Sequence, residues 1–106
     1  MTPSELKTLA LIKDYLESRG QMCFTYNGLR AHHARRRFYT DLDWHTVERN
    51  IRKMAEERRG ILRRYEKTIV RNGRKRRLAI FCWTDRAEQI YRRVVRNYYI
   101  PEDRAK

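Results

Sequence analysis

The strongest pattern of apolar and polar positions lies between Thr40 and Gly60, in the stretch TDLDWHTVERNIRKMAEERRG. Apolar residues recur there at the spacing of one helical face, which predicts an amphipathic helix that packs on a core. The stripe consists of Trp44, Val47, Ile51, Met54 and Ala55. A carboxylate at Asp41 or Asp43 is suited to cap the start, and Gly60 is typical of a helix end.

The other side of this predicted helix is polar and cationic. It carries His45, Thr46, Arg49, Arg52 and Lys53. Three cations and two short polar groups on one side suit the major groove of DNA. Considered alone, the stretch is equally well interpreted as a core helix with a solvated Arg/Glu face.

Two helices and a short strand are predicted before this stretch. Thr2-Pro3-Ser4-Glu5 combines a hydroxyl cap, proline at the first helical position and glutamate three residues after the cap, and Gly20 ends the helix that starts there. The residues from Gln21 to Thr25 allow only a very short strand. The segment from Tyr26 to Tyr39 predicts a second helix, although Gly28 weakens it.

After Gly60 the pattern changes from helical to extended and predicts a β-hairpin. Ile61 to Val70 and Leu78 to Trp83 are rich in β-branched and aromatic residues, and Asn72-Gly73 between them suits a type I′ turn. With that turn, the cross-strand pairs are Arg71–Arg74, Lys67–Leu78, Tyr65–Ile80 and Arg63–Cys82. The other face collects Leu62, Val70, Ala79, Phe81 and Trp83. Neither face is wholly polar, so we expect partial cover on both sides.

A last helix is predicted from about residue 84 to 99, with Asp85 and Glu88 as a capping box. Its apolar stripe is Ala87, Ile90, Tyr91, Val94, Val95 and Tyr98. This stripe can pack within the monomer or form a homodimer through Ile90, Tyr91, Val94, Val95 and Tyr98, and the pattern leaves both open. Residues 1–100 would then form one domain, followed by a flexible polar tail at 101–106.

Charge points to a polyanionic partner. The formal net charge is +13, and arginines far outnumber lysines, which favours bidentate contacts with phosphate or guanine. Five cations crowd the predicted hairpin tip, where only an external counter-charge would relieve their repulsion: Arg71, Arg74, Lys75, Arg76 and Arg77. A membrane surface is the competing polyanion, but no apolar run could span a bilayer and residues Met1–Thr8 are not a signal peptide. We expect a cytoplasmic protein, and a viral or heat-adapted source is compatible with this composition.

We expect no catalytic, metal or cofactor site. His32 and His33 are adjacent, so on a helix they point about 100° apart and cannot clamp one metal ion. Two cysteines and three histidines show no zinc spacing. A nucleic-acid strand-transfer enzyme using one of the seven tyrosines would need a base or metal cluster beside it, and the carboxylates are scattered along the chain.

The order helix, short strand, helix, helix, long hairpin, helix resembles the winged-helix branch of the helix-turn-helix proteins, an α+β and mostly α fold. Arg59-Gly60-Ile61-Leu62-Arg63-Arg64 resembles the turn from a recognition helix into the wing. Trp83-Thr84-Asp85-Arg86-Ala87 resembles the exit from the wing into a final helix. The resemblance implies a recognition helix at Asp43–Arg59 in a major groove and a wing at Arg71–Arg77 on the backbone or an adjacent minor groove.

Under this resemblance the polar side chains divide into two groups. Base edges would be read by His45, Thr46, Arg49 and Lys53. Phosphates would be held by Arg35, Arg36, Arg37, Arg52, Arg71, Arg74, Lys75, Arg76 and Arg77. The leading interpretation is a dimeric transcriptional regulator that binds double-stranded DNA. A non-specific architectural or RNA-binding, ribosome-associated protein is the alternative.

The resemblance also gives the two cysteines a meaning. In winged-helix folds the short first strand pairs with the strand that leaves the wing, so Cys23 and Cys82 would be neighbours and a disulfide becomes a hypothesis. A cytosolic location favours the alternative of two buried, reduced thiols, whereas a hyperthermophilic source weakens that preference.

Overall fold

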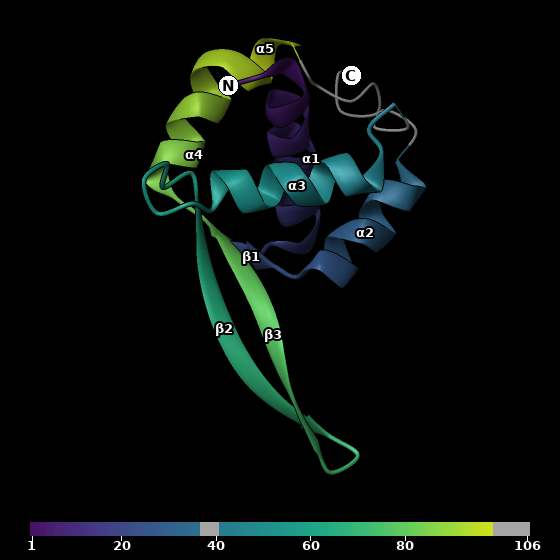
Figure 1. Cartoon of the computed structure of the whole chain (residues 1–106). Coiled ribbons are helices and arrows are strands. Elements are labelled where there is room, and N and C mark those ends of the chain that lie inside the picture. Colours follow the sequence, from purple (N-terminus) through teal and green to yellow (C-terminus); the bar gives the residue numbers. More distant parts are fainter. Residues whose placement is uncertain (37–40, 99–106) are drawn as a thin grey trace.

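A computed structural model describes residues 1–36 and 41–98, which form an α+β, mostly helical structure. Three helices, α1 (Pro3–Arg19), α2 (Tyr26–Arg35) and α3 (Trp44–Met54), pack together above a three-stranded antiparallel sheet (Figure 1). Its strands β1 (Cys23–Phe24), β2 (Leu62–Arg71) and β3 (Arg74–Trp83) lie in the order β1-β3-β2. The chain continues through α4 (Asp85–Ile90), the π-helical turn η2 (Tyr91–Val95) and α5 (Arg96–Tyr98).

Helix α1 is the central element and contacts α2, α3 and η2. The predicted start is confirmed, because the Thr2 hydroxyl accepts from the Glu5 backbone N–H while the Glu5 carboxylate accepts from the Thr2 N–H. Gly20 closes the helix with φ of 62°. Most of the helix is buried, including the polar side chains of Thr8 and Asp14, because neighbours pack around nearly its whole circumference.

Helix α3 packs on α1 through part of the predicted stripe. Val47, Ile51 and Met54 are fully buried, whereas Trp44 and Ala55 are only partly so. Asn50, which the sequence analysis assigned to neither the apolar stripe nor the polar side, is also buried. Its amide donates to Thr8 Oγ1 at 3.0 Å and Ser4 Oγ at 3.3 Å. The two helices are therefore held by apolar burial and by a polar contact inside the interface.

Both predicted ends of this helix need correction. The helix stops at Met54, not near Gly60, because residues 56–59 offer no apolar side chain to bury and instead form turns. At the start, Asp43 is the N-cap residue but its side chain makes no capping hydrogen bond. Asp41 forms an ion pair with Lys7 of α1.

Helix α2 ends at Arg35, with Arg36 as its C-cap, so the described part is shorter than the helix expected to Tyr39. Residues 37–40, including Arg37, lie outside the described residues. Packing explains the glycine at position 28 of α2, because a Cβ at this position would lie 2.4 Å from the Tyr15 hydroxyl oxygen. A glycine here allows α2 to approach α1 closely.

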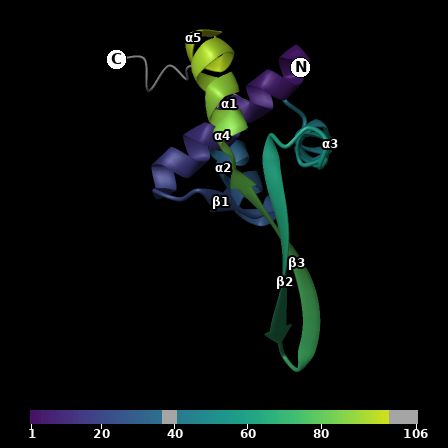
Figure 2. The same ribbon diagram turned by 90° about the vertical axis from the view of Figure 1, so that its left-hand side faces the viewer.

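The hairpin formed by β2 and β3 has the predicted register throughout, with Arg71 opposite Arg74 and Tyr65 opposite Ile80. Asn72 and Gly73 have φ of 52° and 74°, as a type I′ turn requires. The hairpin extends away from the helices (Figures 1 and 2). Its root is buried at Leu62, Phe81 and Trp83. The expected partial cover of both faces is wrong for the outer half, because no described helix reaches beyond the root and residues 70–77 are all exposed.

A disulfide joins the hairpin root to the strand before α2. Cys23 lies opposite Cys82 in the β1–β3 pairing, and their sulfur atoms are bonded. Both residues are half-buried. The structure therefore contains the disulfide and not the alternative of two buried, reduced thiols.

The stripe of the C-terminal helical run packs largely within the monomer. Ala87 and Val95 are fully buried, and Ile90 and Tyr91 pack partly buried against the core. Val94 is 38% exposed. The side chain of Tyr98 lies outside the described residues, and the homodimer stays a prediction. Among the described helices, none has the length and apolar character needed to cross a membrane.

Glu5 ties the start of α1 to the turn after α3. One carboxylate oxygen accepts from the Thr2 hydroxyl, and the other accepts from Arg59 Nη2 at 2.6 Å. Burial of Glu5 opposes its ionisation, but the hydrogen bonds from Arg59 and Thr2 and the charge of Arg59 outweigh it and lower the Glu5 pKa. The ionised form of Glu5 is therefore part of the fold.

Removal of the disulfide should destabilise the protein through the unfolded state. The bond closes a loop with a sequence separation of 59, for which chain entropy gives about 4 kcal/mol of unfolding free energy. We expect Cys23→Ala/Cys82→Ala, or wild type with reductant, to lose about this amount in urea denaturation. Reductant should leave the double variant unchanged. Two free thiols in the unreduced, denatured wild type would contradict the prediction.

Acid should destabilise the protein partly through Glu5. Because its folded-state pKa lies below the unfolded value, its stabilising contribution is present above the unfolded pKa and is lost as pH falls through the folded pKa. We expect Glu5→Gln to be less stable than wild type at neutral pH but to lose less unfolding free energy between about pH 5 and pH 3. Urea denaturation at several pH values measures both. Glu57→Gln, which removes an exposed carboxylate, is the control and should follow wild type. Parallel pH profiles of Glu5→Gln and wild type would refute the role of Glu5.

Candidate nucleic-acid interface

The exposed side of α3 follows directly from its packing on α1. Because Val47, Ile51 and Met54 turn inward, the opposite side of the helix faces solvent. The exposed residues there are His45, Arg49, Arg52 and Lys53. None of them forms an ion pair with another described residue. Thr46, also predicted to read bases, is half-buried at the margin of this side.

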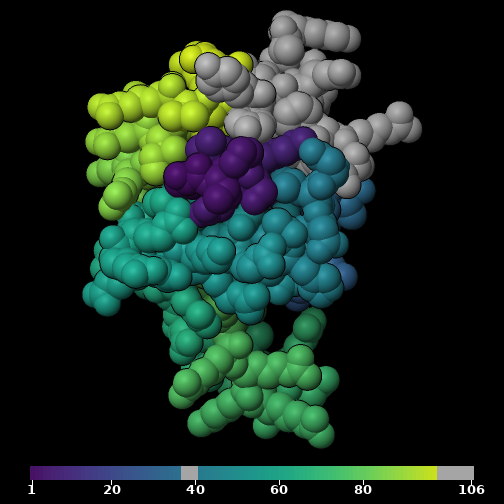
Figure 3. Space-filling model, turned by 45° about the horizontal axis from the view of Figure 1, so that its top comes forward, coloured from purple at the N-terminus to yellow at the C-terminus, as the bar shows by residue number. Residues whose placement is uncertain are grey.

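The hairpin and α3 lie on the same side of α1. Figure 2 shows α3 nearly end-on, with the hairpin descending on the side of the molecule where α3 lies. Figure 3 shows α3 crossing the middle of one face and the hairpin protruding below it. The exposed side of α3 and the hairpin therefore border one broad, open surface.

The hairpin tip concentrates charge as the sequence predicted. Its five cations, Arg71, Arg74, Lys75, Arg76 and Arg77, are all exposed. Arg77 lies 3.8 Å from Glu66, but this pair is in solvent and contributes little. Arg71, Asn72, Arg74 and Arg76 line a shallow hollow at the tip. Like charges at this density raise the local potential and attract phosphate.

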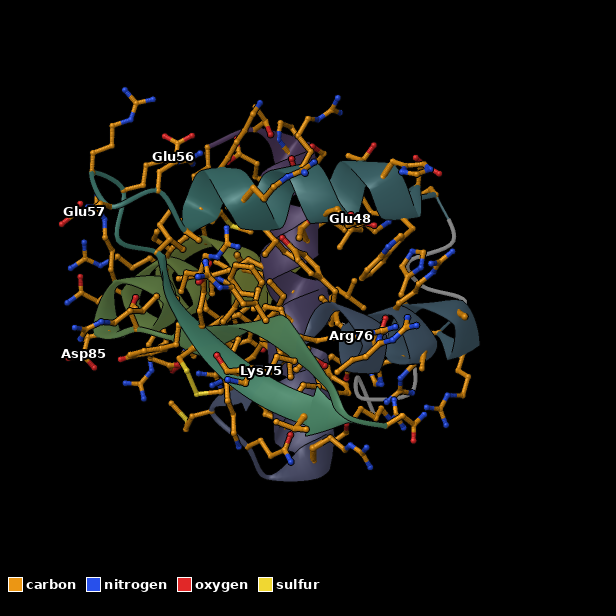
Figure 4. All side chains as sticks on the ribbon, turned by 60° about the horizontal axis from the view of Figure 1, so that its bottom comes forward. Glu48, Glu56, Glu57, Lys75, Arg76 and Asp85 are labelled. Atoms are coloured by element: carbon orange, nitrogen blue, oxygen red, sulfur yellow. A yellow bond between two sulfur atoms is a disulfide. The ribbon has the colours of Figure 1, made fainter. Side chains whose placement is uncertain are left out.

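The structure brings a further group of residues together that the sequence analysis did not select. Its centre is Tyr26 of α2, whose ring packs edge-on against Phe81 with centroids 4.9 Å apart. Burial raises the pKa of the Tyr26 hydroxyl, an effect that Arg52 and Arg64 oppose and the charge of Glu48 reinforces. The charges of these three side chains thus act on the Tyr26 hydroxyl. Glu48 lies on the edge of α3 nearest the hairpin (Figure 4).

Helical periodicity could have indicated Glu48. It follows Trp44 by four residues and precedes Arg52 by four, so the three share one flank of α3. Trp44 contacts α2, with the guanidinium carbon of Arg30 5.9 Å from its ring centroid. The sequence alone could not show which flank faced the hairpin, because that depends on how α2 and β2 pack beside α3.

The arginines at the end of α2 are not grouped with these residues. The buried Asp14 carboxylate lies 3.1 Å from Arg36 Nε and 2.7 Å from His32 Nε2, which ties α2 to α1. Arg35 and Arg36 line a separate hollow over the C-terminal half of α1. The phosphate-binding role predicted for them is therefore not supported by a position beside α3, and Arg37 lies outside the described residues.

The histidines of α2 have structural partners. His32 lies against Asp14, and His33 Nε2 lies 2.7 Å from the Leu42 carbonyl oxygen. No group of three or more His, Cys, Asp or Glu side chains that could hold a metal ion is found within residues 1–36 and 41–98.

Comparisons with protein-family models, with curated proteins and with solved structures find no match to this chain, so the site rests on its own geometry.

Proposed function

We propose that this protein binds double-stranded DNA, with α3 in the major groove and the hairpin on the backbone or the adjacent minor groove. The observation that carries the proposal is the common orientation of two exposed cationic elements, the outer side of α3 and the hairpin tip. Phosphates would supply the counter-charge that the fold itself does not provide.

The dimensions of the two elements support this arrangement. An α-helix with its side chains is about 10–12 Å wide and the major groove of B-DNA is about 12 Å wide. Strands β2 and β3 have 10 residues each. At about 3.3 Å per residue the hairpin reaches about 33 Å, close to one turn of DNA. A hairpin of that length beside α3 could follow the duplex to the next groove.

The polar groups on α3 support sequence reading in addition to attraction. Arg49 lies near the centre of the exposed side, and arginine binds guanine O6 and N7 in a bidentate manner. His45 and Lys53 flank it. In this proposal α3 selects the sequence while the hairpin cations contribute sequence-independent affinity. A regulator of transcription that acts as a dimer remains the form of this function that we favour.

RNA or non-specific architectural binding is the second candidate, and the exposed hairpin favours it. Five cations at a projecting tip can hold the backbone of any nucleic acid. However, the deep, narrow major groove of A-form RNA does not admit a helix, so the polar side of α3 would have no role there. In a strand-transfer enzyme Tyr26 would be a poor nucleophile, because burial raises the pKa of its hydroxyl.

Substitutions in α3 and in the hairpin should have different effects on DNA binding. We expect Arg49→Ala to reduce discrimination between preferred and unrelated duplexes by about 5- to 150-fold. We expect Arg74→Ala/Arg76→Ala to weaken all duplexes alike and to lower the slope of log K against log salt by about 2. Titration of labelled duplexes at several salt concentrations, with random DNA and structured RNA as competitors, measures both effects.

Arg93→Ala provides the control for this experiment, because Arg93 is an exposed cation on the C-terminal helical run, away from the hairpin. It should leave both discrimination and salt slope near their wild-type values. Equal losses on every sequence from Arg49→Ala and the hairpin variant would argue against base reading by Arg49. If the wild-type protein does not bind duplex DNA at low salt, the proposal is wrong.

A further inference from the structure

Glu48 is an acidic residue on the surface that otherwise attracts a polyanion. It lies half-buried on the flank of α3 that faces the hairpin, and Figure 4 shows it at that edge of the helix. Thr46 and Lys53 occupy nearly the opposite flank, since residues two or five positions away point about 140–160° from it. Glu48 therefore lies on the side of α3 that faces the hairpin.

The carboxylate of Glu48 forms no ion pair or hydrogen bond within the described part of the chain. Other acids of this protein are used to join elements, as Glu5 is with Arg59 and Glu88 with Lys13. Arg52, Arg64 and Glu48 all act electrostatically on the Tyr26 hydroxyl, yet neither arginine forms an ion pair with Glu48. Its charge is thus available to a group outside the fold.

The chemistry of DNA restricts what that group can be. A phosphate would be repelled by Glu48 at contact distance. In the major groove, the base-edge donors are the exocyclic amino groups of cytosine and adenine, and carboxylates characteristically accept from cytosine N4. A carboxylate on this flank therefore gains only where a base edge, and not the backbone, lies against it.

Arg52 supplies a donor for guanine beside the acceptor that Glu48 supplies for cytosine. It is one turn after Glu48 on the same flank, and side chains at this spacing are about 5–6 Å apart at Cβ. Stacked base pairs are about 3.4 Å apart, so two long side chains at this spacing can reach the same base pair or neighbouring ones. The arginine fork matches guanine O6 and N7.

We propose that Glu48 and Arg52 together read a cytosine and a guanine at the same or adjacent base pairs, with Glu48 accepting from cytosine N4 and Arg52 donating to guanine O6 and N7. This inference rests on the proposed function and assigns to Arg52 a base-reading role in place of phosphate binding. It makes Glu48 a specificity-determining residue, which the cationic composition of the chain alone would not indicate.

The test is selection of bound duplexes from a random pool by wild type, Glu48→Ala, Glu48→Gln and Arg52→Ala. We expect wild type to prefer cytosine at one position and Glu48→Ala to lose that preference by about 5- to 150-fold, with the other positions unchanged. Glu48→Gln should move the preference at that position toward adenine, because glutamine binds adenine N6 and N7. Arg52→Ala should lose a guanine preference at the same or the next base pair.

Glu57→Ala is the matched control, since Glu57 is an exposed acid in the turn beyond α3 and should leave the selected sequence unchanged. Urea denaturation of each variant confirms that it is folded, and Glu48→Gln preserves the size of the side chain. A shift from cytosine to adenine in that variant is a readout that a purely structural role of Glu48 would not produce.

The outcomes separate this inference from the proposed function. If the Glu48 variants select the wild-type sequence, or if Glu48→Ala only tightens binding to every duplex, the inference is overturned while DNA binding stands. If wild type binds duplexes without any sequence preference, the inference fails and the architectural alternative gains. If wild type binds no duplex, the proposed function fails and the inference falls with it.

Discussion

The packing of α3 against α1 is the contact on which the rest of the structure depends. Val47, Ile51 and Met54 are removed from water, and Asn50 bonds to two hydroxyls of α1 within the same interface. Full burial of each apolar side chain contributes about 1.5–3 kcal/mol, whereas the polar contact favours one rotational setting of the helix. That setting decides which side of α3 faces solvent. Base reading by Arg49, and by Glu48 and Arg52, would require it.

The hairpin is held at one end only. Leu62, Phe81 and Trp83 pack into the core, and the disulfide between Cys23 and Cys82 attaches β3 to the strand before α2. Beyond that root, the two strands have only each other, and an isolated two-stranded hairpin is marginally stable in water. The type I′ turn and the cross-strand pairs give the outer half its shape. Phosphate contacts at the tip would also offset the repulsion among its cations.

Charges serve two purposes in this molecule. Several carboxylates join elements inside it, as Asp14 does with His32 and Arg36, and Glu5 does with Arg59. Among the described residues, cations that form no ion pair remain on α3 and at the hairpin tip, Arg49 and Arg74 among them. Glu48 is an unpaired acid on that cationic surface. For this reason it is more informative about binding specificity than any single arginine beside it. Affinity for a polyanion needs only positive charge, but discrimination also needs groups that reject the wrong contact.

The sequence by itself determined the features that depend on neighbours in the chain. The capping box of Thr2 and Glu5, the αL residue Gly20 and the hairpin register set by Asn72-Gly73 are local, and each was predicted correctly. The inward side of α3 was also predictable, because helical spacing alone places its apolar residues together. The tertiary structure decided the rest. Met54 ends α3 because no core lies beyond it, and Gly28 is needed because Tyr15 lies against it. Only the tertiary structure shows that the flank of α3 with Glu48 faces the hairpin. Periodicity states which residues share a face, but which element that face meets depends on contacts between segments far apart in the chain.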